Sequence, residues 1–131
     1  MGKYFSLVEM CRSAKGLSLG IANVPDAQAK AKIEALIVNV LDPLRRDYGR
    51  AITVNSGYRC PALNKAIGGV TTSQHMKGEA ADITGGSKAE NKKIFELAKK
   101  LPFDQLINEK NYTWIHVSFG TRNRKQILKI D

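Results

Sequence analysis

Apolar residues recur at helical spacing over one long stretch in the first half of the chain. These residues lie three or four positions apart, which places them on one face of an α-helix: Ile33, Leu36, Ile37, Val40, Leu41 and Leu44. Asp26 precedes the stretch, and its carboxylate can accept the free N–H groups of a first helical turn. Gly49 follows it, and glycine commonly ends helices. The pattern predicts one long helix over Ala27–Tyr48, kinked at Pro43.

Shorter segments with helical and strand patterns flank this helix. Phe5–Ala14 predicts a short helix, after which Gly16 and Gly20 break the pattern. Beyond the long helix the chain predicts, in order, a strand at Ala51–Asn55, a short helix from Pro61, a loop at Gly68–Ser73, a strand at Ala80–Thr84, a helix at Lys88–Lys100, a hairpin of Asp104–Glu109 and Thr113–Phe119, and an edge strand at Gln126–Ile130. This order indicates an α+β domain with a small, mainly antiparallel sheet packed with helices.

The length and composition fit a globular protein. A chain of 131 residues suits one domain over residues 1–131, and 43% hydrophobic with 25% charged residues argues against disorder. No apolar run approaches the roughly 20 residues that a membrane span needs. Met1–Lys15 lacks the uninterrupted apolar stretch of a signal peptide. We therefore expect a monomer that is cytoplasmic as synthesised.

The formal net charge of +9 favours acidic partners, such as nucleic acid, an anionic membrane surface or an anionic polymer of the bacterial cell wall. The basic residues are scattered apart from Arg122, Arg124 and Lys125, and a solvated basic face explains them equally well. A nucleic-acid binder would need a reading helix or an aromatic platform, and neither is recognisable here. We therefore expect no nucleic-acid partner.

The two cysteines give no sign of a metal or disulfide scaffold. Cys11 and Cys60 match no zinc motif in their spacing, and two cysteines are too few for a disulfide framework. Free buried thiols are expected in a cytoplasmic product, and a pairing between the two stays open.

Both histidines of the chain stand in places that suggest chemistry. His75 lies where a loop runs into the predicted strand that carries Asp82, an acid among apolar neighbours that is costly to bury unless it is paired or metal-bound. His116 lies in the most strand-like segment and shares its face with Trp114 and Ser118. Two imidazoles and one carboxylate suit zinc, which in catalytic sites has three protein ligands. The spacing alone equally allows a surface histidine at 75 and a hydrogen-bonded sheet histidine at 116.

The residues around these positions carry a family resemblance. They are Ser56-Gly57-Tyr58-Arg59-Cys60-Pro61, Leu63-Asn64, Gly68-Gly69, Ser73-Gln74-His75, Gly78, Ala80-Ala81-Asp82-Ile83 and Trp114-Ile115-His116-Val117-Ser118. From about Phe5 to Phe119 the chain resembles the M15 peptidase family, which includes zinc D-Ala-D-Ala carboxypeptidases and phage endolysins that cut peptidoglycan stem peptides. It is most similar to the short branch found in phages and prophages. The resemblance implies the fold that this family shares with the hedgehog signalling domain.

The resemblance also implies roles for individual residues. It implies that His75, Asp82 and His116 bind zinc and that Arg59 faces the substrate, where a planar guanidinium suits a carboxylate or a polarised carbonyl. A structural Arg59 paired with an acid remains the alternative. Ser73 and Gln74 are expected to line the cleft and bind substrate, or to orient His75.

One position departs from the family pattern. Many members carry a glutamate general base three residues before the last histidine, where this chain has Thr113. The nearest acid is Glu109, which can reach the site across the predicted hairpin and is our predicted general base; Asp104 is a second, weaker candidate. A solvated hairpin acid is the alternative for Glu109.

The sequence therefore predicts a zinc metallopeptidase that hydrolyses peptidoglycan stem peptides, either like a D-Ala-D-Ala carboxypeptidase or like an L-Ala-D-Glu endopeptidase. A phage lysis enzyme, released to the wall by another protein, fits the expected lack of a signal peptide. The alternative is a non-catalytic, zinc-containing wall-binding module on the same fold.

Overall fold

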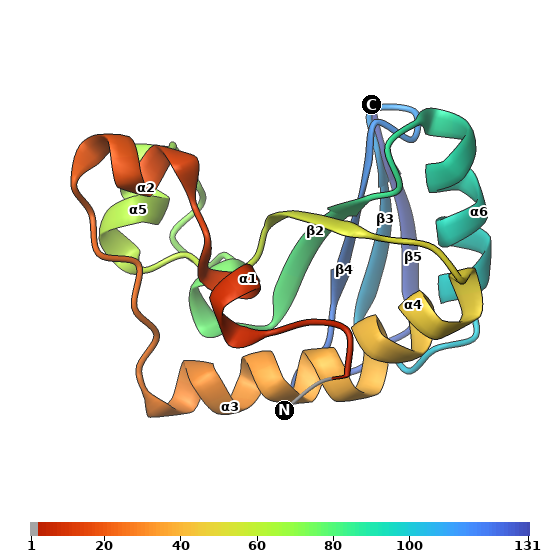
Figure 1. Ribbon diagram of the computed structural model, residues 1–131, viewed down its shortest axis with the longest axis horizontal. Coiled ribbons are helices and arrows are strands. Elements are labelled where there is room, and N and C mark those ends of the chain that lie inside the picture. Colours follow the sequence, from red (N-terminus) through yellow and green to blue (C-terminus); the bar gives the residue numbers. More distant parts are fainter. Residues whose placement is uncertain (1–2) are drawn as a thin grey trace.

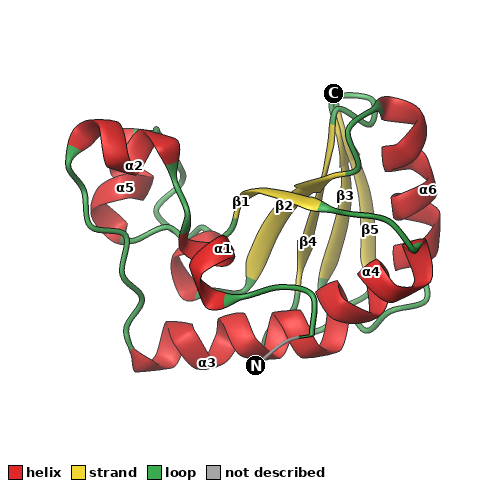
Figure 2. Ribbon diagram, viewed as in Figure 1, coloured by secondary structure: helices red, strands yellow, loops and turns green. Residues whose placement is uncertain are grey.

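The computed structural model describes residues 3–131, with helices in the first part of the chain and mixed elements after it. The first part contains α1 (Leu7–Cys11), α2 (Ala14–Leu19), α3 (Ala27–Leu36), the π-helical η1 (Ile37–Leu41) and α4 (Asp42–Tyr48). The second contains β1 (Thr53–Ser56), α5 (Pro61–Ala66), the 3₁₀ turn η2 (Gln74–Lys77), β2 (Ala80–Thr84), α6 (Lys88–Ala98), β3 (Gln105–Glu109), β4 (Trp114–Ser118) and β5 (Gln126–Ile130). The predicted α+β class is confirmed (Figure 2).

The five strands form one sheet in the order β1-β2-β4-β3-β5. All neighbours are antiparallel except β3 and β5, which run parallel. β5 lies at an edge, as predicted, so the sheet is mainly but not entirely antiparallel. Figure 1 shows α6 beside the sheet, α3 running below it, and α2 with α5 standing apart from it.

The two faces of the sheet differ in polarity because side chains alternate along each strand. One face is buried in a single hydrophobic cluster that includes side chains of α3, η1, α4 and α6. Its sheet members are Ala81, Ile83, Leu106, Ile115 and Val117. Asp82 and His116 occupy the opposite face, where both side chains are only partly buried. The core thus fixes the orientation of the polar face.

The long predicted helix is confirmed in extent, and it contains a π-helical segment that was not predicted. Asp26 caps its start by accepting the N–H of Ala29, and Gly49 ends it with a φ of 77°. The irregularity comes just before Pro43 as the π-helical segment η1, in which the N–H of Asp42 reaches back to the carbonyl of Ile37. Proline has no N–H and crowds the preceding turn, so a wider turn lets the helix continue past it.

The N-terminal helix prediction was wrong in detail. Two short helices replace it, because Ser6 and Ser13 each cap a new helical start. Gly16 lies inside α2 and does not break it, whereas Gly20 ends α2 in a left-handed conformation with a φ of 68°.

Other predicted elements differ from the structure mainly at their ends: the first strand begins at Thr53, and α6 stops at Ala98. Cys11 and Cys60 are both free thiols. Met1 and Gly2, at the start of the stretch expected to lack a signal peptide, lie outside the described residues.

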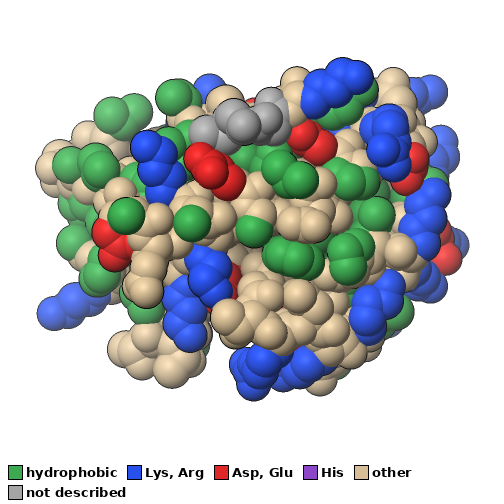
Figure 3. All heavy atoms as spheres, turned by 90° about the horizontal axis from the view of Figure 1, so that it is seen from below, with side chains coloured by type: hydrophobic (Ala, Val, Ile, Leu, Met, Phe, Trp, Pro, Cys, Tyr) green, Lys and Arg blue, Asp and Glu red, His purple; other side chains and the backbone are tan. Residues whose placement is uncertain are grey.

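The positive charge is spread around the surface. The face seen from below Figure 1 carries Lys and Arg side chains around its rim, with apolar side chains between them (Figure 3). Within residues 3–131, no helix is both long enough and apolar enough to cross a bilayer.

Candidate metal centre

Adjacent strands bring Asp82 and His116 together. The two residues face each other in the antiparallel register of β2 and β4, and side chains of opposed residues share a sheet face. The Nδ1 atom of His116 lies 2.9 Å from Oδ1 of Asp82. The second oxygen of Asp82, Oδ2, lies 3.4 Å from Nε2 of His75. One carboxylate thus faces both histidines of the chain.

His75 reaches this point from a turn that the preceding motif holds in place. It lies in η2, which Ser73 caps by accepting the N–H of His75. Nδ1 of His75 lies 2.7 Å from the carbonyl oxygen of Gly57, and the N–H of Arg59 donates to the carbonyl of His75. Because a carbonyl oxygen only accepts, Nδ1 carries the proton, and Nε2 presents its lone pair to Asp82.

The donor set of this cluster fits zinc. One donor atom from each of the three residues lies within 4.8 Å of the other two. Zinc bonds of about 2.0–2.2 Å in a tetrahedron place ligand atoms roughly 3.3–3.6 Å apart, close to the 3.4 Å and 2.9 Å separations here. Two nitrogens with one oxygen suit zinc better than calcium or magnesium, which prefer oxygen ligands. In this tautomer, Nε2 of His75 and the carboxylate of Asp82 face each other as two acceptors, an arrangement that a cation between them stabilises.

The Asp82 carboxylate is held in its ionised form. Burial works to raise its pKa, but the hydrogen bond from His116 and the proximity of His75 outweigh burial and leave the pKa well below its ordinary value. An ionised carboxylate is the state that a metal ligand requires.

Glu109 faces the same side of the sheet as His116. The hairpin register places Glu109 directly opposite Trp114, which lies two residues before His116 on β4. The turn that sets this register, Lys110–Thr113, is held by Asn108, whose side chain accepts the N–H of Tyr112. Burial raises the pKa of Glu109 above its ordinary value, with a smaller opposing effect of His116. The sequence left open which face Glu109 would take, and the structure places it on the face that carries His116.

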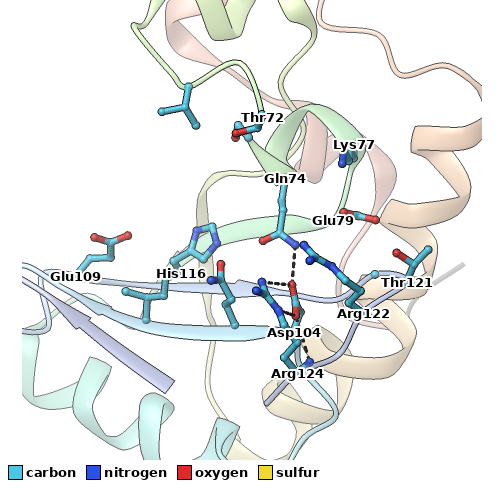
Figure 4. A pocket seen from close by; sticks show the side chains of 15 residues that line it. Thr72, Gln74, Lys77, Glu79, Asp104, Glu109, His116, Thr121, Arg122 and Arg124 are labelled. Atoms are coloured by element: carbon cyan, nitrogen blue, oxygen red, sulfur yellow. Dashed lines mark hydrogen bonds and ion pairs between the residues drawn. The ribbon is translucent and has the colours of Figure 1, made fainter. Parts of the chain in front are cut away.

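Four of the predicted site residues line one cleft of about 490 Å³: Ser73, Gln74, Glu109 and His116. Glu109 and His116 lie at one end of it, and Ser73 and Gln74 form part of the wall (Figure 4). Gln74 does not contact His75 through its side chain but donates to Asp104 at 2.9 Å. The structure thus brings together the residues expected to line the cleft.

Asp104 lies in this cleft but is already engaged. Its buried carboxylate accepts from Nε of Arg124 at 2.7 Å and from Nη2 at 3.1 Å, and also from the backbone N–H of Arg124 and from Gln74. The hydrogen bond of the Arg124 guanidinium lowers the pKa of Asp104 to about 2. A carboxylate so stabilised in its ionised form is a poor proton acceptor near neutral pH, so Glu109 is the better candidate for a general base.

Arg59, like His75 and Asp82, does not line this cleft. Its Nη1 donates to Oδ1 of Asn64 at 3.2 Å, whereas its Nε is buried without a hydrogen-bond partner in the described part of the chain. Partial burial lowers the pKa of Arg59, and the charge of Asp82 opposes this effect. The Arg59 guanidinium therefore lies within electrostatic range of Asp82, one of the candidate metal ligands.

Two residues that support the site were given no role in the sequence analysis, Gly57 and Asn91. A Cβ at Gly57 would lie 2.3 Å from the carbonyl oxygen of Met10, so only glycine lets its carbonyl reach His75. Asn91 of α6 is buried and makes four hydrogen bonds, to Thr84, Gly85, Tyr112 and Thr113. Gly57 could have been found from its place in the Ser-Gly-Tyr-Arg motif, whereas an asparagine within a helical pattern gives no signal of its own.

Comparison with known proteins agrees with this geometry. The family model described as peptidase M15 matches residues 3–118. The zinc D-Ala-D-Ala carboxypeptidase of Streptomyces albus G is 32% identical over 84 residues, which make up 64% of this chain and 32% of that protein. The chain thus spans about a third of the length of this curated relative. Because the family model covers most of the chain and the His75–Asp82–His116 cluster lies within it, we conclude that the chain belongs to the peptidase M15 family.

Proposed function

We propose that this protein is a zinc peptidase that hydrolyses peptide bonds in the stem peptides of bacterial peptidoglycan. Family membership and the name of the Streptomyces relative support the reaction and the substrate class. The net charge of +9 suits the anionic wall polymer. The observation that carries the proposal is the cleft in which Glu109 lies beside His116 of the metal cluster.

The residues of this chain divide the chemistry between them. His75, Asp82 and His116 would hold the zinc ion. When bound, zinc supplies Lewis acidity, which polarises a carbonyl and acidifies water. Glu109 accepts the proton of the attacking water and returns it to the leaving amine. Arg59 holds or polarises the substrate near Asp82.

Digestion of peptidoglycan fragments by zinc-loaded protein, followed by mass spectrometry, tests the proposal. Release of a single terminal D-Ala identifies a carboxypeptidase, and cleavage between L-Ala and D-Glu identifies an endopeptidase. His116→Ala serves as the matched inactive control. Intact fragments after prolonged incubation with zinc-loaded protein would rule out the peptidase.

A non-catalytic, zinc-containing wall-binding module is the second proposal, and Thr113 at the usual general-base position favours it. This module would sediment with insoluble peptidoglycan and retain zinc without releasing products. The peptidase would release products under the same conditions.

The route to the wall is part of the same proposal. We propose that the protein is cytoplasmic as synthesised and reaches peptidoglycan after release by another protein, as a phage lysis enzyme does. The support is the resemblance to the phage branch of the family. Fractionation of producing cells before and after lysis tests it, since activity in the outer compartment of intact cells would contradict this route.

A further inference from the structure

We propose that the cleft contains a second recognition point, a carboxylate-binding subsite formed by Lys77 and Arg122, which selects peptides that carry a carboxylate away from the scissile bond. This inference rests on the proposed peptidase function and specifies its substrate. We call this pair the distal subsite.

The distal subsite lies at the opposite end of the cleft from the metal cluster. Lys77 comes from the last position of η2, and Arg122 comes from the loop between β4 and β5. Both line the same cleft as His116 and Glu109. Figure 4 shows Glu109 and His116 on one side and Lys77 and Arg122 on the other, with the Arg122 side chain extending toward Gln74.

The cations of the distal subsite have no anionic partner within residues 3–131. The two acids nearby are already neutralised: Glu79 pairs with Lys32 at 2.9 Å, and Asp104 pairs with Arg124. Neither Lys77 nor Arg122 makes an ion pair or a side-chain hydrogen bond with any residue that the structure describes. This end of the cleft thus carries excess positive charge.

The loop that carries Arg122 is anchored to the rest of the domain on both sides of this residue. Asp104 is almost completely buried, and it binds both the backbone N–H and the guanidinium of Arg124, two residues beyond Arg122. On the other side of Arg122, a Cβ at Gly120 would lie 2.6 Å from the Glu79 carboxylate, so the loop also packs closely there. Anchoring on both sides lowers the entropy cost of placing the Arg122 guanidinium in the cleft.

The chemistry of the pair favours a carboxylate ligand. A guanidinium binds a carboxylate through two parallel hydrogen bonds, and an ammonium in the same cleft adds electrostatic attraction that requires no fixed geometry. Because the subsite lies across the cleft from His116, its carboxylate belongs to a residue other than the one at the scissile bond. In a stem peptide that is cut between its two terminal D-Ala residues, the α-carboxylate of the γ-linked D-Glu has this character.

Two matched peptides test the subsite. They are identical except that the γ-linked D-Glu carries either a free α-carboxylate or an α-amide. For the carboxylate peptide we expect Arg122→Ala and Lys77→Ala each to lower kcat/KM by about two- to fivefold, as exposed charge-assisted contacts do, and this loss to shrink with added salt. The amide peptide should be cleaved at the same rate by parent and variants. Lys92→Ala, which removes an exposed cation on α6 outside this cleft, should change neither rate.

Calorimetric titration supplies a readout that needs no turnover. The peptides are titrated into Glu109→Gln protein with and without Arg122→Ala, and only the carboxylate peptide should bind about two- to fivefold more weakly when Arg122 is absent. A loss that is equal for the two peptides, or no loss, overturns the subsite and leaves the peptidase proposal intact. Selective, Arg122-dependent binding by parent protein that cleaves neither peptide supports the subsite and refutes the peptidase.

Discussion

The Nδ1 atom of His75 lies 2.7 Å from the carbonyl oxygen of Gly57, and this contact joins the family motif to the candidate metal centre. It fixes the tautomer of His75 so that Nε2 faces Asp82 at 3.4 Å. The segment that follows β1 also holds the η2 turn through Arg59, whose N–H donates to the carbonyl oxygen of His75. The position of a zinc ligand thus depends on a backbone carbonyl 18 residues earlier in the chain.

Gly57→Ala is the first prediction from this contact. An added Cβ would lie 2.3 Å from the backbone oxygen of Met10, and the strand end must move to relieve the clash. We expect a loss of about 1–3 kcal/mol in unfolding free energy and weaker zinc binding, because the carbonyl no longer orients His75. Chemical denaturation and a competitive zinc titration measure the two effects. Gly86→Ala provides a control, since no atom lies within 4 Å of its Cβ position, although its φ of 102° adds local strain. Unchanged zinc affinity in Gly57→Ala would contradict the role of the carbonyl.

Removal of the metal should lower the melting temperature. We expect one zinc ion per chain in protein purified without chelator, because the cluster contains three suitable donors. A ligand that binds only the folded state at 100 times its Kd adds about 2.7 kcal/mol of stability, which corresponds to about 5–10 °C for a domain of this size. Elemental analysis and thermal scans with and without EDTA measure both quantities. His75→Ala should show no response to EDTA, and a parent protein with near-zero zinc content and no response would refute the metal site.

Arg59→Lys should lower activity and leave the zinc content unchanged. Lysine keeps the charge near Asp82, but it lacks the planar fork and cannot reproduce the Arg59–Asn64 hydrogen bond together with a substrate contact. The measurement is kcat/KM on the cleaved peptide, with Arg46→Lys on the exposed face of α4 as control. Parent-level turnover in Arg59→Lys would assign Arg59 a structural role.

The stability of the fold should depend on the ionisation of Asp104. Its folded-state pKa of about 2 lies below the ordinary 3.8, so the ionised form stabilises the fold above about pH 4, and this contribution is lost as the pH falls toward 2. Asp104→Asn should lower the unfolding free energy at pH 7 by about 1–3 kcal/mol and reduce the acid sensitivity between pH 4 and 2. Urea denaturation over this pH range measures the effect, with the exposed Asp131→Asn as control. Parallel stability profiles of parent and Asp104→Asn would disprove this contribution.

The metal cluster could be predicted from the sequence because few residue types can bind zinc. His75 and His116 are the only histidines, and Asp82 stands out as an acid between apolar neighbours. The alternation around His116 also predicted correctly that its side chain lies on the face opposite Ile115 and Val117. Residue type and local periodicity identified the candidate ligands, and the family resemblance favoured a metal site over a surface histidine at 75 and a hydrogen-bonded sheet histidine at 116.

Features that depend on contacts between distant segments could not be predicted in the same way. The strand order places β4 between β2 and β3, and nothing local to His116 indicates that Asp82 is its partner. Asn91 looks like an ordinary helix residue, yet it joins α6 to both β2 and the β3–β4 turn. These features follow from tertiary packing, which local propensity does not encode.

Glu109→Gln tests the catalytic proposal most directly. Glu109 faces Trp114 across the hairpin and lines the cleft beside His116, so its carboxylate is on the correct side of the sheet to receive a proton from water at the metal. Glutamine has nearly the same shape but cannot accept that proton, and we expect kcat to fall about 10²–10⁴-fold while the zinc content and melting temperature stay at parent values. Steady-state kinetics, elemental analysis and thermal scans measure these quantities, and Glu96→Gln on the exposed side of α6 is the matched control. The role depends on the hairpin register, since a slip of one residue would turn Glu109 to the other face of the sheet. Parent-level kcat in Glu109→Gln would show that another group is the general base.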